Sequence, residues 1–129
     1  MMKPSAVALI AAPPDSLRYS LRALLAGLPL VGEVRAVEDA AALLAAVPQL
    51  RPGLIVLDIN LVGEAAQSVL AQIKATTDTR VVVLVDFANQ QANLQAAPID
   101  LVVVKGHPAA DLFAQLERLL VQPRPSGDY

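Results

Sequence analysis

Five short stretches with strand-like apolar residues are spaced along the chain, and four of them lack the polar alternation of a strand with one wet face. They cover residues 6–11, 31–37, 54–57, 81–85 and 101–104, and the second is the weakest. Apolar runs of this length are typical of strands buried on both faces of a parallel sheet. The pattern therefore predicts five strands.

Helical spacing fills the gaps between these runs. The first helix is marked by leucines three and four positions apart, namely Leu17, Leu21, Leu24, Leu25 and Leu28. Asp15 or Ser16 is its candidate N-cap, and residues 27–29, Gly-Leu-Pro, are its stop signal.

Three further segments have helical features. A second helix opens at residues 38–39 and ends near Pro48, a third carries the apolar residues of 66–73, and the last opens at Asp111. Residues 87–97 are short and polar, and form at most a helix with little to bury. The stretch after Asp58 is expected to be a loop.

Strands that alternate with helices predict an α/β domain with a doubly wound, five-stranded parallel sheet and helices on both faces. For the strand order 2-1-3-4-5, the first and last helices share one face and the others cover the opposite face. Sites in such sheets form beyond the carboxyl ends of the strands, at the point where the strand order reverses. Asp58 ends the third strand and is expected opposite the corner at residues 11–13.

The chain has 129 residues, of which 55% are hydrophobic, enough for one core. We expect one domain over residues 1–121, followed by a flexible tail or the start of a linker at 122–129. The net charge is −2 and the basic residues are scattered, so neither nucleic-acid binding nor a polybasic membrane patch is expected. There is no cysteine, which excludes disulfides and thiolate catalysis.

The first 14 residues raise the alternative of a signal peptide, but their apolar stretch is short for one and suits a first strand better. No apolar run approaches the roughly 20 residues that a membrane span needs. The expected location is the cytoplasm.

Four stretches, in this order and spacing, resemble the receiver domain of bacterial two-component response regulators over residues 5 to 121. They are LRALL (21–25), LIVLD (54–58), DTRVVVL (78–84) and LVVVK (101–105). The resemblance implies the flavodoxin-like (CheY-like) fold. It also implies that Asp58 is the phospho-acceptor position and that Lys105 is the lysine that pairs with it.

The chain departs from this family where magnesium would bind. Ala12 and Pro13 stand where family members carry two acidic residues, which leaves Asp58 and the Asn60 carbonyl as vestigial ligands. Magnesium prefers octahedral oxygen coordination. We therefore expect no useful magnesium affinity and no cofactor.

Two positions of the family's conformational switch are also altered. Val85 replaces the hydroxyl residue that ends the fourth strand, and Val102 replaces the aromatic residue of the fifth. Valine cannot donate a hydrogen bond to a phosphoryl group and has no ring to turn inward. The coupling element of the switch is expected to be missing.

The residue types alone allow a simpler explanation of the site. Lys105 could be a solvated lysine at a strand end, and Asp58 a carboxylate that caps a loop. The family register instead favours their pairing. His107, the only histidine, is assigned to the turn before the last helix. No motif suggests an enzyme.

Three functions follow from these observations. The first is a degenerate receiver that acts as a protein-interaction module in signal transduction, with a histidine kinase or an effector as partner. The second is a receiver that a dedicated kinase phosphorylates on Asp58, and the third is a flavodoxin-like domain that binds a small ligand. A homodimer, if formed, is expected to use the fourth helix (87–97), the fifth strand and the last helix.

Overall fold

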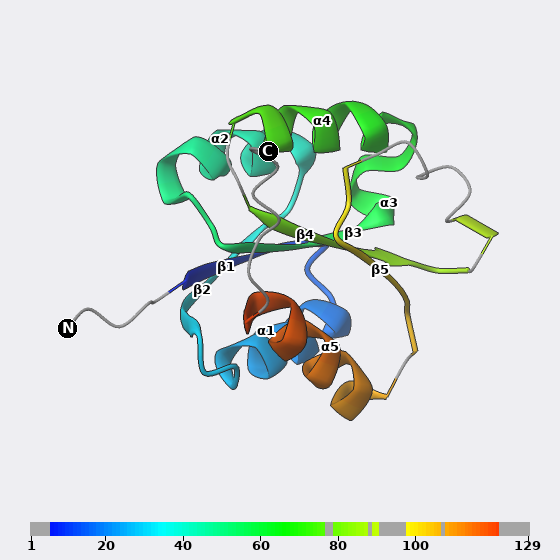
Figure 1. The fold of residues 1–129 in the computed structure, drawn as a ribbon. Helices are drawn as coiled ribbons and strands as arrows, with labels where there is room; N and C mark the ends of the chain where they lie inside the picture. The colour runs from blue at the N-terminus through cyan, green and yellow to red at the C-terminus, as the bar shows by residue number, and fades with distance from the viewer. Residues whose placement is uncertain (1–5, 77–78, 88, 91–97, 107, 122–129) are drawn as a thin grey trace, which may run out of the picture.

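The computed structural model describes residues 6–76, 79–87, 89–90, 98–106 and 108–121. Its centre is a parallel sheet in the order β2-β1-β3-β4-β5, which confirms the predicted topology (Figure 1). The strands are β1 (Ala6–Ala11), β2 (Val31–Val37), β3 (Leu54–Asp58), β4 (Arg80–Val85) and β5 (Leu101–Val104).

Helices cover both faces of this sheet. Helices α1 (Ser16–Ala26) and α5 (Ala109–Val121) lie on one face, and α2 (Ala40–Leu50) and α4 (Ala66–Thr76) lie on the other, as predicted (Figure 1). The helix considered at 87–97 falls mostly outside the described residues. Within them, no helix is long and apolar enough to cross a membrane.

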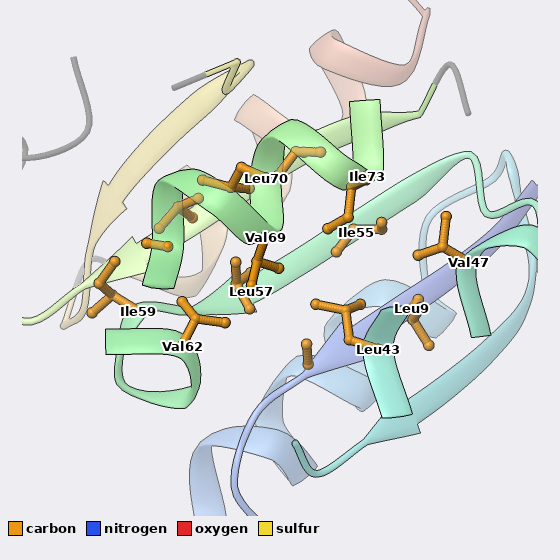
Figure 2. Close-up of a cluster of buried hydrophobic side chains, with 14 of the residues drawn as sticks. Leu9, Leu43, Val47, Ile55, Leu57, Ile59, Val62, Val69, Leu70 and Ile73 are labelled. Carbon is orange, nitrogen blue, oxygen red and sulfur yellow. The ribbon is translucent and has the colours of Figure 1, made fainter. Parts of the chain in front are cut away.

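The alternation of side chains along each strand divides the core into two clusters. On the α2 and α4 face, Leu9, Ile55 and Leu57 pack against Leu43 and Leu70, all completely buried (Figure 2). On the opposite face, buried residues of the same strands pack against α1 and α5. Burial on both faces explains why the central strands are almost entirely apolar, whereas the edge strand β2 includes the exposed residues Glu33 and Arg35.

Two aspartates cap the helices that follow β1 and β2. Asp15 accepts hydrogen bonds from the backbone N–H groups of Leu17 and Arg18. Asp39 accepts from Ala42 N at 2.7 Å. Each carboxylate satisfies amide groups that have no partner within the helix, and so fixes where the helix begins.

Two helix boundaries differ from the prediction. Helix α2 continues past Pro48 to Leu50, because a proline in the last turn removes only one hydrogen bond while Leu50 still packs on the core. Helix α5 begins two residues before Asp111, because the Pro108 carbonyl already accepts from the amides of the first turn.

The expected loop after Asp58 is instead helical. Helix α3 (Ile59–Val62) and the 3₁₀ turn η1 (Gly63–Ala65) connect β3 to α4. Ile59 and Val62 are buried in the α2 and α4 cluster, which holds this short segment against the sheet (Figure 2). Four residues are too few for an apolar period to show in the sequence.

Candidate functional site at the carboxyl ends of the strands

Asp58 lies at the reversal of strand order, as expected. Leu57 pairs with Ala11 of β1, and Asp58 itself pairs with Leu84 of β4. Asp58 is only 2% exposed, and it is one of few buried charged side chains among the described residues. A carboxylate at this depth needs hydrogen bonds or a cation to offset its lost hydration.

Lys105 provides that cation. Its backbone N–H donates to Val85 O at 2.8 Å, which extends the pairing of β5 with β4 by one residue. Its Nζ lies 2.9 Å from Asp58 Oδ1 and 2.8 Å from Asp86 Oδ1. The lysine therefore contacts two carboxylates, one from the end of β3 and one that follows β4.

Asn60 joins the same two carboxylates from the other side. Its backbone N–H donates to Asp58 Oδ1 at 2.9 Å, and its side-chain Nδ2 donates to Asp86 Oδ2 at 2.8 Å. Asp58, Asn60, Asp86 and Lys105 thus form a closed circuit of polar contacts, called here the carboxylate ring. Asp58 caps α3 and also pairs with Lys105, so the two readings of this residue are compatible.

Asp86 is the site residue that the sequence did not single out. The backbone N–H groups of Asp86 and Phe87 both donate to Gln90 Oε1, at 2.6 and 2.9 Å. This local turn fixes where Asp86 leaves β4. The only sequence signal was an acid one residue after a buried strand, at the edge where Asp58 and Lys105 also end.

The contacts of the ring shift two pKa values. Hydrogen bonds from Lys105 and then Asn60 hold the pKa of Asp86 below its ordinary value of 3.8. Burial pulls the pKa of Lys105 down, but hydrogen bonds to Asp86 and Asp58 outweigh it and raise that pKa above 10.5. Each partner thereby favours the charged form of the other.

The end of β1 carries a different chemistry. Ala12 is fully buried and Pro13 is half-buried, and neither side chain contains an oxygen. The guanidinium of Arg18 reaches this corner, where its Nη2 donates to Ala12 O at 3.3 Å and lies 3.6 Å from Glu38 Oε2. The positively charged side chain of Arg18 is therefore in contact with the backbone at Ala12.

Magnesium takes carboxylate and water oxygens in octahedral geometry. In this structure one oxygen of each carboxylate, Asp58 Oδ1 and Asp86 Oδ1, instead contacts Lys105 Nζ. Within the described part of the chain, no three acidic, histidine or cysteine residues are grouped as a metal site would need.

Val85 directly precedes Asp86 at the end of β4, and Val102 pairs with Val83 further back along the same two strands. Val85 is completely buried in the cluster under α2 and α4, and Val102 is half-buried against the same cluster. Both make apolar contacts there. His107 lies outside the described residues.

The fold is similar to that of solved receiver domains, each below 25% sequence identity. The signal receiver domain of a putative LuxO repressor protein from Vibrio parahaemolyticus is 19% identical with a TM-score of 0.76, over 90% of both chains. The response regulator domain of Thermotoga maritima CheB is 17% identical with a TM-score of 0.71, over 92% of this chain and 99% of that one.

A third similar structure is the phosphorylated cyanobacterial phytochrome response regulator RcpA. It is 23% identical with a TM-score of 0.70, over 89% of this chain and 91% of that one. No family model matches the sequence, and neither does any curated protein. The chain therefore has the receiver-domain, CheY-like fold, as the sequence resemblance implied.

Proposed function

We propose that this chain is a receiver-like domain that acts as a protein-interaction module in signal transduction, without magnesium-dependent phosphorylation of Asp58. The observation that carries the proposal is the carboxylate ring. Lys105, the residue that would steady a phosphoryl group on Asp58, is already in contact with two carboxylates.

The corner at Ala12 supports the same proposal. Phosphoryl transfer to a carboxylate depends on positioning and on neutralising the charge of the transferred group. At this corner the guanidinium of Arg18 contacts a backbone carbonyl, and no acidic side chain stands at residues 12 and 13 to hold a metal. We therefore propose that this chain lacks the bound metal ion that neutralises the phosphoryl charge in conventional receivers.

A partner protein is part of this proposal. The partner class is a histidine kinase or an effector of a signalling system. A second copy of the chain is the alternative, through the face that contains β5 and α5. Phe87, two residues after β4, and Val121, the last residue of α5, are large apolar side chains with 67% and 61% exposure.

The test is to incubate the protein with acetyl phosphate and magnesium and to map any phosphate by mass spectrometry. We expect no mass increase on Asp58. We also expect no rise in melting temperature with millimolar magnesium, whereas an ion at ten times its dissociation constant would stabilise the fold by about 1.4 kcal/mol. A phosphate on Asp58 would instead support the second function, a receiver served by its own kinase.

A further inference from the structure

Both oxygens of the Asp86 carboxylate are used within the ring. Oδ1 lies 2.8 Å from Lys105 Nζ, and Oδ2 accepts from Asn60 Nδ2 at 2.8 Å. An oxyanion placed beside Asp58 would draw on these same two residues, because Lys105 Nζ and the Asn60 backbone N–H both lie 2.9 Å from Asp58 Oδ1. Asp86 and an external oxyanion therefore compete.

The position of Asp86 is set by the fold. It follows directly after β4, whose register with β3 places Leu84 beside Asp58. The Gln90 side chain then accepts from the amides of residues 86 and 87. The carboxylate thus reaches Lys105 from a backbone that is held in place at two points.

We propose that Asp86 is a tethered anion, a specificity-determining residue whose carboxylate occupies the hydrogen-bond donors next to Asp58 and keeps free oxyanions such as phosphate and sulfate from binding at this edge. The inference rests on the proposed function and deepens it. It names the group that keeps Lys105 from serving an incoming anion.

Charge explains why removal of Asp86 changes the binding preference. The ring holds two carboxylates and one ammonium, so its formal charge is negative and it repels an anion. With Asp86→Ala, Asp58 and Lys105 form a neutral pair, and the Asn60 amide has lost its acceptor. Hydrogen bonds from a charged donor to an oxyanion are about twice as strong as those between neutral groups.

The experiment measures sulfate binding by calorimetry and thermal shift, in a chelator and at constant ionic strength set with chloride. Wild type is expected to show no saturable response. Asp86→Ala is expected to show saturable sulfate binding with an affinity at least about tenfold above the detection limit that wild type does not reach, a difference of about 1.4 kcal/mol or more. The double variant Asp86→Ala/Lys105→Met is expected to lose this response.

A second lysine and aspartate pair offers a matched control. Lys74 Nζ lies 3.0 Å from Asp100 Oδ2, and the two side chains are 22% and 23% exposed, against 22% and 30% for Lys105 and Asp86. Asp100→Ala frees a lysine of the same exposure outside the ring. It is expected to leave sulfate binding as in wild type, and an equal gain in this variant would overturn the proposal.

Two further outcomes separate this inference from the proposed function. If Asp86→Ala does not bind sulfate and acetyl phosphate does not phosphorylate wild type, the tethered-anion inference is wrong and the proposed function stands. If wild type accepts a phosphate on Asp58 and yet only the variant binds sulfate, the proposed function fails and Asp86 still sets anion affinity.

If Asp86→Ala does not fold, Asp86→Asn provides a more conservative test. It keeps the size of the side chain and a carbonyl acceptor for Lys105 while removing the charge. A gain in sulfate affinity smaller than that of the alanine variant is expected, and no gain at all counts against the proposal.

Discussion

Asp58 shows how one carboxylate serves two local purposes. Its Oδ1 accepts from the Asn60 N–H and so starts α3, and the same oxygen lies 2.9 Å from Lys105 Nζ. Because the side chain is only 3% exposed, these contacts replace most of its hydration. The residue is therefore structurally constrained, whatever its role in signalling.

Replacement of the lysine measures this constraint. Lys105→Met is expected to lower the free energy of unfolding by about 1–3 kcal/mol, because it leaves the buried Asp58 without its cation, while the partial exposure of the site admits some water. Chemical denaturation of the two proteins is the measurement. Lys74→Met, which removes the cation of a less buried carboxylate, is the control and is expected to cost less.

The ring also predicts a pH dependence. The pKa of Asp86 is lowered by Lys105 and Asn60, so its contribution to stability is present above the ordinary value of 3.8 and is lost as pH falls through the lower folded value. The pKa of Lys105 is raised, so its contribution is present below 10.5 and is lost as pH rises through the higher folded value.

The comparison of wild type with Asp86→Asn isolates the loss of stability that Asp86 causes at acid pH. The difference in unfolding free energy is expected to be flat between about pH 5 and pH 9 and to shrink in more acid solution. Denaturation curves across this range provide the measurement. A difference that grows as the pH falls below 4 would contradict the assignment.

The pairing of Asp58 with Lys105 could be predicted because the family register places both residues at strand ends on the same edge of the sheet. Asp86 could not, because its role depends on how far β4 extends relative to β5 and on the turn that Gln90 holds. Arg18 was missed for a similar reason. Its contact with the Ala12 carbonyl depends on how α1 packs over the end of β1.

At the scale of elements, strands were easier to predict than helix ends. Burial on both faces demands uniformly apolar strands, and this demand leaves a clear mark on the sequence. The end of α2 depends instead on a balance between Pro48, which lacks an N–H, and the packing of Leu50. Such a balance has no local sequence pattern.

Arg51, the C-cap residue of α2, gives a testable prediction. Arg51 caps α2 with a φ of 47°, in the left-handed region that a side chain with a Cβ adopts at a cost. Arg51→Gly is expected to raise the free energy of unfolding by about 0.5–1 kcal/mol, since glycine removes that strain but loses more entropy on folding. Thermal and urea unfolding measure the change.

A neighbouring variant serves as its control. Asp39→Ala removes the N-cap of the same helix and is expected to cost about 1 kcal/mol. If both variants change stability in the same direction, the left-handed geometry at Arg51 does not explain the end of α2.

At the scale of the whole molecule, the topology brings the ends of β1, β3, β4 and β5 to one edge, which holds both the carboxylate ring and the Ala12 corner. The sheet order was predictable from alternating strands and helices together with the family resemblance. The chemistry of the edge required the structure, because it depends on contacts between residues that are far apart in the sequence.

Adding two acids at the Ala12 corner tests the proposed absence of magnesium binding. The double variant Ala12→Asp/Pro13→Asp introduces carboxylates at a corner where Ala12 is fully buried, so it should be less stable than wild type without metal. Magnesium should restore stability, by about 1.4 kcal/mol at ten times the dissociation constant. Calorimetry and thermal shift measure both effects.

The control is Ala41→Asp/Ala45→Asp, which adds the same charge at exposed positions of α2. It is expected to be indifferent to magnesium. If the double variant at residues 12 and 13 is equally indifferent, Asp58 does not contribute to a common site with that corner.

The short strand β5 depends on charges at both of its ends. Just before it, Asp100 Oδ2 accepts from Val81 N at 2.7 Å and pairs with Lys74, and just after it Lys105 enters the carboxylate ring. The strand itself reads Leu-Val-Val-Val, so a slip along β4 would exchange one apolar side chain for another of nearly equal fit. The ion pairs of Asp100 and Lys105 favour one register of β5 on β4. The register of this edge strand is therefore specified by residues that lie outside the strand.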